Sequence, residues 1–493
     1  MNPSHEGAVR VPDPAAYATG SHDLPVSSAL SAFMGTGWEP SPLPNTGALA
    51  VSAWTATRRA LLAERFPGER IVIPAGREKI RSNDMPYDFR PHTAYTYLTG
   101  DRTPEGVLVM EPDGAATLCL RPRSARDGEA FRDRVHGEFW VGRRPALSEA
   151  EQMLRMPVAD LRLLPGLLDG PPVPTRVLRG VDAAVDELLP GPRGPRGPRD
   201  TELLAALSEL RLRKSPWEVD ELRTAVDVTV RGFEDVARSL AKAARHPRGE
   251  RWVEGVFGHR ARLEGNGVGY GTIAAAGEHA CTLHWTRNDG PVRPGELLLL
   301  DAGAETDTLY TADITRTLPI SGTFTPLQRD LYELEFAAQD AGIAALRPGA
   351  RFRDFHLAAM RVIVGGLIDM GIVTTGLDEA LDPRDERYRR YTLCASGHML
   401  GMDVHDCAQA RAGAYLDATL EAGHVLTVEP GVYFQPDDLT VPRELRGIGI
   451  RIEDDLVITP SGAELLSAAL PRSPGDVEAW LGGLMDGTTP PIR

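Results

Sequence analysis

Residues 296–320 read ELLLLDAGAETDTLYTADITRTLPI and contain two apolar segments, each of which carries an aspartate. The apolar run at 296–300 predicts a buried strand, and Asp301 lies where that strand reaches the turn Ala-Gly-Ala. Asp313 opens the second segment, in which apolar and polar residues alternate as in a strand that pairs back on the first. The stretch therefore predicts an antiparallel hairpin that brings two carboxylates face to face.

Two glutamates lie in strand-like sequence nearer the C-terminus. Glu429 belongs to HVLTVEPGVY (424–433), where the Pro-Gly pair ends a strand directly after the acid. Glu453 ends GIGIRIE (447–453), in which isoleucines alternate with glycine, arginine and glutamate. The backbone therefore fixes the direction of both acids, and Arg451 shares the polar strand face of Glu453.

A pair of metal ions explains why so many acids gather in apolar sequence. With the histidine at 398, the candidate ligands are Asp301, Asp313, His398, Glu429 and Glu453. Crowded carboxylates repel, and an ionised acid out of water costs several kcal/mol unless it is paired or metal-bound. Four carboxylates and one imidazole suit Mn2+ or Co2+ better than a structural zinc site, which favours thiolates. Two ions roughly 3.5 to 4 Å apart can hold a bridging hydroxide and polarise a carbonyl, so the set predicts hydrolysis of an amide or ester.

Each of these five residues also has a plain structural explanation when it is considered alone. An isolated aspartate after a strand is usually a turn residue, and an isolated glutamate on a late strand usually faces solvent. All five, however, lie in glycine-rich, apolar strand sequence that penalises an unpaired carboxylate. The set as a whole therefore favours metal ligation.

Several motifs resemble those of the pita-bread metallopeptidases, and most closely those of the Xaa-Pro aminopeptidases (aminopeptidase P). They are DAGA and DITRT (within 301–317), SGHMLGMDVHD (396–406), LTVEPGVY (426–433), RGIGIRIEDD (446–455), RKSPWE (213–218) and CTLHW (281–285). The resemblance covers nearly everything from residue 50 onward. It implies an α+β fold, in which a smaller α/β domain precedes a C-terminal pita-bread domain with a curved antiparallel sheet and pseudo-twofold halves.

The resemblance also implies a role for each candidate residue. The four acids and the histidine named above match the family's ligands for two divalent metal ions, expected to be Mn2+. Asp313 and Glu453 match the bridging positions, His398 matches a ligand of one ion only, and Glu429 also matches the acid assigned to proton transfer.

Four further residues match positions around the substrate and behind the metals. His284 and His405 match two histidines that flank the substrate and do not bind metal. Arg451 and Tyr433 match a pair that orients the ligands and relays protons. The sequence gives an independent reason for the arginine, because a cation on the strand face of a ligand neutralises excess carboxylate charge. The other histidines that lie in polar stretches, His246, His356 and His424, are expected to be exposed.

The favoured function is an aminopeptidase that releases the N-terminal residue from peptides with proline in the second position. The tertiary amide before proline lacks an N–H, so peptidases that need this donor fail. A prolidase is the alternative, since Arg443 and Arg446 can bind a dipeptide's carboxylate, although the link from Pro430 to Arg451 resembles the aminopeptidases more closely. A metal-free pita-bread binding protein is a third interpretation, and the retention of all five ligands counts against it.

Two positions depart from the family pattern. The spacing from Asp301 to Asp313 is one residue longer than usual, which is expected to enlarge the turn at 306–310 without moving the ligands. Cys394 lies four residues before His398, where many relatives carry another histidine, and a thiol there can act as a soft metal ligand. Because the chain has only four cysteines (119, 281, 394 and 407) and no Cys-x-x-Cys, a buried thiol is the favoured interpretation.

The composition and the N-terminal sequence indicate which partners and which cellular location to expect. The 493 residues carry 54 basic and 69 acidic side chains, a net charge of -15, which argues against nucleic-acid or anionic membrane partners. The N-terminus lacks a basic segment followed by an apolar one, and no stretch approaches 18 apolar residues. With few cysteines, these features predict a cytoplasmic location. The resemblance implies peptide substrates with Xaa-Pro N-termini and a homodimer or homotetramer.

Three regions are expected along the chain. Residues 1–50 are rich in Pro, Gly, Ser and Ala without periodicity, which predicts a partly disordered extension. Residues 51–200 predict the aminopeptidase P-type α/β domain, with a helix at 54–66, strands at 70–74, 95–98, 106–110 and 116–120, and an exposed loop at the Gly-Pro-Arg repeats (191–199). Residues 201–493 predict the pita-bread domain. Within it, capping-box signals at Ser215 and Thr325 each precede a long helix, and the repeated helix-then-strand order predicts two similar halves.

Overall fold

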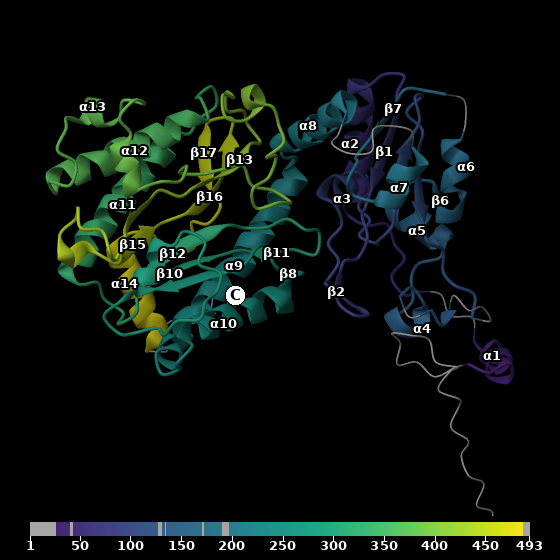
Figure 1. Cartoon of the computed structure of the whole chain (residues 1–493), viewed down its shortest axis with the longest axis horizontal. Coiled ribbons are helices and arrows are strands. Elements are labelled where there is room, and N and C mark those ends of the chain that lie inside the picture. Colours follow the sequence, from purple (N-terminus) through teal and green to yellow (C-terminus); the bar gives the residue numbers. More distant parts are fainter. Residues whose placement is uncertain are drawn as a thin grey trace, which may run out of the picture. The chain divides into compact units, whose positions relative to one another are not determined.

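The structure is a computed structural model of the chain that describes residues 26–39, 43–126, 131–133, 135–169, 172–189 and 197–486. The chain divides between Leu204 and Ala205 into two compact units, unit 1 and unit 2 (Figure 1). Much of the predicted extension (1–25 and 40–42) and most of the Gly-Pro-Arg repeats (191–196) lie outside the described residues. No helix in the described part of the chain is long and apolar enough to cross a membrane.

Unit 1 is built on a mixed five-stranded sheet. Its strands are β1 (Arg70–Pro74), β4 (Val107–Met110), β5 (Ala116–Leu120), β6 (Val158–Asp160) and β7 (Thr175–Val177). They lie in the order β6-β5-β4-β1-β7, in which β1–β7 and β5–β6 are parallel and the other pairs are antiparallel. The strands predicted at 70–74, 106–110 and 116–120 are confirmed by β1, β4 and β5.

Short helices and one hairpin complete unit 1. The helices are α1 (Ser28–Met34), α2 (Ser52–Arg65), α3 (Thr93–Thr99), α4 (Glu138–Val141), α5 (Leu147–Leu154), α6 (Leu164–Leu168) and α7 (Ala183–Leu188). The hairpin pairs β2 (Ile80–Ser82) with β3 (Met85–Pro86). α2 confirms the helix predicted at 54–66.

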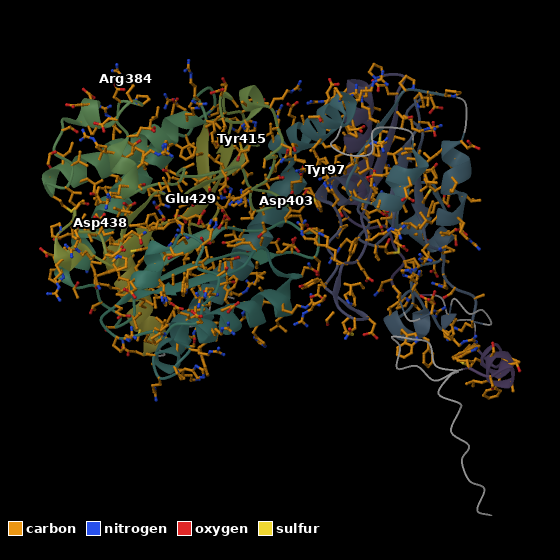
Figure 2. The ribbon with its side chains drawn as sticks, in the orientation of Figure 1. Tyr97, Arg384, Asp403, Tyr415, Glu429 and Asp438 are labelled. Carbon is orange, nitrogen blue, oxygen red and sulfur yellow. The ribbon has the colours of Figure 1, made fainter. Side chains whose placement is uncertain are left out.

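The prediction of a strand at 95–98 is wrong, because this segment belongs to helix α3. His92 caps the start of the helix by accepting an amide hydrogen bond, and Gly100 ends it with a left-handed φ of 77°. The guanidinium of Arg58, on α2, donates to the Tyr97 carbonyl in the last turn (3.0 Å; Tyr97 is labelled in Figure 2). Capping and tertiary contacts therefore override the strand propensity of the tyrosines and threonines.

Unit 2 has two halves with the same order of elements, a pair of long helices followed by strands. The first half contains α9 (Pro216–Ala243), α10 (Gly249–Glu264), β8 (Gly267–Val268), β9 (Ile273–Ala276), β10 (Leu297–Ala302), β11 (Ala304–Glu305) and β12 (Ile314–Pro319). The second contains α11 (Pro326–Ala345), α12 (Arg353–Asp369), α13 (Leu377–Ala380), β13 (Val425–Val428), β14 (Gly431–Phe434), β15 (Ile448–Arg451), β16 (Asp454–Thr459) and β17 (Gly462–Leu465). α8 (Pro198–Leu212) precedes the first half, and α14 (Pro474–Met485) follows the second. The paired helices α9–α10 and α11–α12 pack against each other.

The strands of unit 2 pair within each half, and further hydrogen bonds connect the halves. The sheets have the orders β12-β10-β9, β13-β16-β17, β11-β8 and β14-β15, and every pair in them is antiparallel. Across the halves, the Glu453 amide donates to the Thr315 carbonyl (3.0 Å), and the Thr317 hydroxyl donates to the Arg451 carbonyl (2.9 Å). Unit 2 thus has the pita-bread architecture that the motifs predicted, with helices outside and strands at the centre (Figure 1).

The long helices begin where the sequence predicts. At α9, Ser215 accepts from the Glu218 amide while the Glu218 carboxylate accepts from the Ser215 amide, and a proline occupies the first turn. At α11, Thr325 and Gln328 repeat this reciprocal pairing. Both helices then bury one face in the main hydrophobic core of unit 2.

A glutamate on α11 is fully buried in the core of unit 2. Glu335 is 0% exposed, and among the described residues neither of its carboxylate oxygens has a hydrogen-bond partner. Burial raises the pKa of this carboxyl well above its ordinary value. The resulting cost to folding is absent below the unfolded pKa, about 4.3, and grows as the pH rises above it.

We expect Glu335→Gln to stabilise unit 2 increasingly with pH. The difference in unfolding free energy should be small at pH 4 and grow by about 1.4 kcal/mol per pH unit while Glu335 stays protonated in the folded chain. Thermal unfolding of variant and parent, with the same metal content at each pH, measures this difference. A difference that does not change with pH would contradict the buried, ionisable state assigned to Glu335.

Candidate active site

One cavity of unit 2, about 600 Å³ in volume, collects the predicted site residues. The residues of the predicted set that line it are Asp301, Asp313, His284, His398, His405, Glu429, Arg451 and Glu453. Tyr433 is buried directly behind Arg451. The backbone brings them together, because the four candidate acids lie at strand ends or in short links between strands of both halves, and His398 precedes the isolated bridge between Met399 and Leu426 of β13. Glu429, labelled in Figure 2, lies in unit 2 between β13 and β14.

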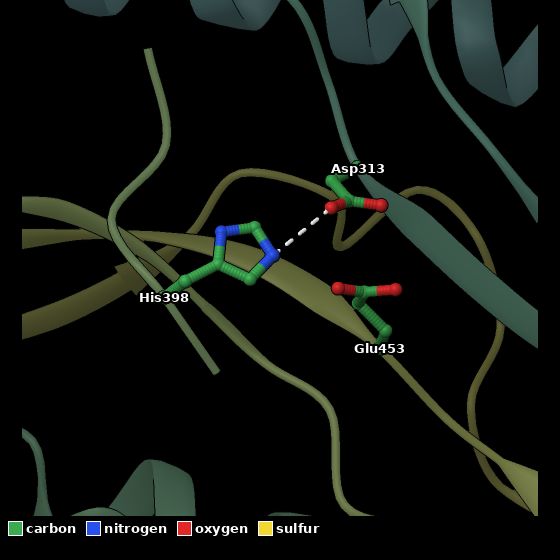
Figure 3. A group of neighbouring side chains, drawn as sticks. All are labelled: Asp313, His398 and Glu453. Atoms are coloured by element: carbon green, nitrogen blue, oxygen red, sulfur yellow. Dashed lines mark ion pairs between the residues drawn. The ribbon is translucent and has the colours of Figure 1, made fainter. Parts of the chain in front are cut away.

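The closest group of candidate ligands is Asp313, His398 and Glu453 (Figure 3). One ligand atom from each of these residues lies within 4.8 Å of those from the other two. The Nε2 atom of His398 is 3.2 Å from Oδ2 of Asp313 and 3.3 Å from Oε1 of Glu429. Three of the four candidate acids therefore lie close to the imidazole of His398.

Asp301 is held beside this group by a buried arginine. Arg451 donates through Nη2 to Oδ2 of Asp301 (2.5 Å) and through Nη1 to the Tyr433 hydroxyl (2.9 Å). Its Nε donates to the hydroxyl of Thr315 (3.2 Å), which in turn donates to Oε2 of Glu453 (2.7 Å). One guanidinium thus contacts Asp301 of the first half directly and Glu453 of the second half through Thr315.

The electrostatics of the cavity favour a bound cation. Burial raises the pKa of Glu453 well above its ordinary value, and Asp313 raises it further. Burial also raises the pKa of Glu429 to about 7. Although burial by itself lowers the pKa of His398, its bond to Asp313 and the charge of Glu429 raise it to about 9. In addition, Oε1 of Glu453 is buried and has no hydrogen-bond partner among the described residues. Divalent ions would relieve all of these penalties, so the donor set fits them.

The two histidines that are predicted not to bind metal differ in exposure from most of the candidate ligands. His284 and His405 are exposed at the cavity, whereas the aspartates and Glu453 are buried. The ring of His405 lies edge-on to that of His398, with centroids 4.5 Å apart. Partial desolvation at the cavity wall and the charge of the neighbouring His398 lower the pKa of His405. A neutral imidazole that borders the cavity is therefore available to a bound molecule.

Two residues of the site were not predicted. The hydroxyl of Tyr270 lies 2.6 Å from Oδ1 of Asp301 and 2.5 Å from Oδ1 of Asp313, so it links the two hairpin aspartates. Its only sequence signal is a large aromatic residue between two glycines, GYG at 269–271. Thr315, which bonds Glu453, lies within the motif DITRT, where its position two residues after an expected ligand was the available signal.

The two departures from the family pattern lie in the turn between β10 and β12 and at the wall of the cavity. β10 and β12 pair Asp301 with Thr315, and the chain between them turns at 306–310. Within this turn, Leu309 adopts the left-handed backbone conformation (φ 69°), although its side chain is fully buried. Cys394 lines the cavity and is half-buried, so the prediction of a buried thiol is wrong at this position, while the other three cysteines are buried.

The histidines expected to be exposed fall into three environments. His246 is exposed, as predicted. His356 is half-buried and bonded to the Ser396 hydroxyl (2.9 Å). His424 is buried at 6% exposure, and burial lowers its pKa to about 4. The prediction is therefore wrong for His356 and His424. In the case of His424, a polar neighbourhood in sequence does not reveal that its segment forms a bridge with Arg213.

Comparison with known proteins agrees with this geometry. Residues 220–460 match metallopeptidase family M24, and residues 55–162 match the N-terminal domain of aminopeptidase P. Xaa-Pro aminopeptidase 1 of Streptomyces coelicolor is 54% identical over 462 residues, 93% of each chain. A solved aminopeptidase of Pseudomonas aeruginosa has a TM-score of 0.77 at 32% identity, over 90% of this chain and 99% of its own. Aminopeptidase P of Escherichia coli, solved with the inhibitor Pro-Leu, has a TM-score of 0.76 at 30% identity, over 90% of this chain and 100% of its own.

These matches define a metallopeptidase, a hydrolase of a family that uses divalent metal ions. Over nearly all of its length the chain belongs to the Xaa-Pro aminopeptidases of metallopeptidase family M24. The family and fold that the motifs implied are thereby confirmed.

Proposed function

We propose that the chain releases the N-terminal residue from peptides with proline in the second position, and that the cavity of unit 2 is its active site. The observation that carries this proposal is the single cavity in which five metal-type side chains and two exposed histidines meet. The 54% identity to a Streptomyces coelicolor Xaa-Pro aminopeptidase supports the substrate class. The Pro-Leu inhibitor of the Escherichia coli structure supports it as well.

We assign the metals to the five candidate ligands, with Asp313 and Glu453 shared between two ions and His398 on one. When bound, the ions act as a Lewis acid toward the scissile carbonyl and lower the pKa of a water molecule. Mn2+ is the proposed ion, because four carboxylates and one imidazole form an oxygen-rich set. Cys394 borders the cavity, so a softer ion such as Zn2+ is the natural competitor in binding tests.

The chain's own groups position the substrate and move its protons. The side chain of Glu429 is 16% exposed at the cavity, where it can carry a proton to the leaving amine. His284 and His405 border the same space and are proposed to donate hydrogen bonds to the peptide. Arg451 and Tyr433 hold Asp301 in place from behind.

The location of two arginines favours an aminopeptidase over a prolidase. Arg446 lines a separate cavity with Glu278 and His279, and its guanidinium donates to the Val441 carbonyl (3.0 Å). Arg443 is exposed on a different segment from the walls of the active-site cavity. Neither arginine is thus placed to bind the carboxylate of a dipeptide in the proposed active site.

A substrate panel tests the function. With Mn2+ present, we expect Xaa-Pro-Yaa tripeptides and longer Xaa-Pro peptides to be cleaved after the first residue, and chelated enzyme to be inactive. Peptides with alanine in place of the proline are the matched controls and should be poor substrates. Cleavage confined to Xaa-Pro dipeptides would replace the proposal with a prolidase.

We propose a homodimer or homotetramer in the cytoplasm. Exposed aromatic and aliphatic side chains of unit 1 support self-association, among them Phe33, Phe139, Trp140 and Val141. The four free cysteines are compatible with a reducing compartment. Sedimentation at micromolar concentration tests the assembly, and a species of 53.4 kDa, the mass of one chain, would refute it. Cell fractionation tests the location.

A further inference from the structure

A buried ion cluster lies directly behind the loop that carries His405. Asp406, the next residue, accepts from Nζ of Lys214 (3.0 Å) and from Nε of Arg211 (3.0 Å). The side chains of Lys214 and Asp406 are each 1% exposed, and that of Arg211 is 8% exposed. A buried carboxylate between two cations holds its ionised form, and the pKa of Asp406 is lowered to about 2 despite its burial.

Further hydrogen bonds hold the ion cluster in place. Besides binding Asp406, Lys214 donates from Nζ to the Arg211 carbonyl (2.7 Å), and its own amide donates to the Gly423 carbonyl (2.8 Å). The Asp406 amide donates to the Met399 carbonyl (2.9 Å), next to His398. Asp403, which precedes His405 by two residues and is labelled in Figure 2, lies 3.6 Å from the guanidinium of Arg211. The backbone that carries His405 is therefore anchored on both sides.

Close packing restricts the cation at position 214. A Cβ added to Gly401 would lie 2.1 Å from Oδ2 of Asp406 and 3.0 Å from Cε of Lys214. Arginine outnumbers lysine 51 to 3 in the chain (54 basic residues in all), and the other two lysines, Lys79 and Lys242, are exposed. A compact ammonium thus fills the buried site in a chain that uses arginine almost everywhere else.

We infer that Lys214 and Asp406 are positioning residues for catalysis: their buried pair sets the place of the His405 imidazole at the cavity. This inference rests on the proposed function, in which His405 contacts the substrate. The pair is not at the cavity surface and does not touch the candidate ligands. Breaking it should therefore move His405 while leaving metal binding intact.

A double-mutant cycle tests this inference. Lys214→Met keeps the length of the side chain and removes its charge, and we expect it to lower kcat by about 10²-fold, the effect of a misplacement of about 1 Å. Metal content and KM for an Xaa-Pro-Yaa tripeptide should stay within about threefold of the parent. In a His405→Ala background, Lys214→Met should change kcat less than about threefold, because the imidazole it positions is gone. Asp406→Asn carries the same expectations and serves if Lys214→Met does not fold.

The matched control is Lys242→Met, which removes an exposed lysine and should leave kcat unchanged. Full activity of a folded Lys214→Met or Asp406→Asn protein, or losses that multiply with that of His405→Ala, would overturn the inference. These outcomes differ from a failure of the proposed function, in which His405→Ala alone would be fully active.

Discussion

Glu453→Ala is expected to lower kcat/KM on an Xaa-Pro-Yaa tripeptide by on the order of 10³-fold or more. Glu453 lies at the junction of the two halves, and its carboxylate meets Asp313 and His398 in the cavity. In the proposed assignment it binds both metal ions, so its loss removes a donor from each ion at once. Asp313→Ala should have a comparable effect for the same reason. Steady-state kinetics in a metal-buffered assay, together with the metal stoichiometry of the purified variants, measure both effects.

Replacing Glu453 should lower activity but raise the thermal stability of the metal-free protein. Because burial and Asp313 raise the pKa of Glu453 well above its ordinary value, this acid lowers the stability of the metal-free fold as the pH rises above the unfolded pKa. The isosteric variant Glu453→Gln should therefore melt at a higher temperature than the parent at pH 8 in chelator, and Mn2+ should no longer raise that temperature. Glu444→Ala, which truncates an exposed glutamate, is the control. Near-parental turnover of Glu453→Ala would refute the two-metal mechanism.

The parts of the fold that the sequence predicts are those determined by neighbouring residues. The capping boxes at Ser215 and Thr325 begin α9 and α11, since each box satisfies its own amides within one helical turn. The hairpin that carries Asp301 and Asp313 forms as expected because its alternation and its turn lie within one stretch. The helix α3 is not predicted because part of what stabilises its last turn is distant: Arg58 and Arg59 of α2, 39 positions earlier, donate to the carbonyls of Tyr97 and Leu98.

In the site, too, features with a local sequence signal could be predicted, and features set by distant residues could not. The candidate ligands were recognisable because acids in apolar strand sequence conflict with their surroundings, and only a partner resolves that conflict. Tyr270 has no such conflict, since a tyrosine between glycines suits many loops. The pairing of Lys214 with Asp406 spans 192 positions, and the sequence shows only two common charged residues. Long-range pairing thus determines the features that could not be predicted.

The site also explains why the two halves must be joined at the strands that carry ligands. Glu453 receives one hydrogen bond from Thr315, and its backbone amide donates to the carbonyl of the same residue. Arg451 connects Asp301 of the first half with Tyr433 of the second. The geometry of the acids is therefore a property of the junction, and substitutions that separate the halves should affect metal binding before they affect either helix pair.

The second large effect is expected at two histidines whose rings are 4.5 Å apart but whose roles differ. His398 contacts Asp313 and Glu429 through Nε2, as a ligand would, whereas His405 is exposed at the cavity. His398→Ala should therefore lose metal and activity together. His405→Ala should keep the metal content of the parent and lose about 10²-fold in kcat, because a hydrogen bond to the reacting amide that strengthens in the transition state accelerates the chemical step.

The alternative for His405 is a residue that only fills the turn beside Asp406. The buried cluster of Asp406 with Lys214 holds that turn without help from the imidazole, so truncation at 405 should leave the thermal unfolding temperature nearly unchanged. Metal stoichiometry and kcat measured on both variants separate the two roles, with exposed His246→Ala as the matched control. A fully active His405→Ala protein would leave it as a turn residue, and one that had lost metal would make it a ligand. Retained metal with slow turnover is the result that places His405 on the substrate.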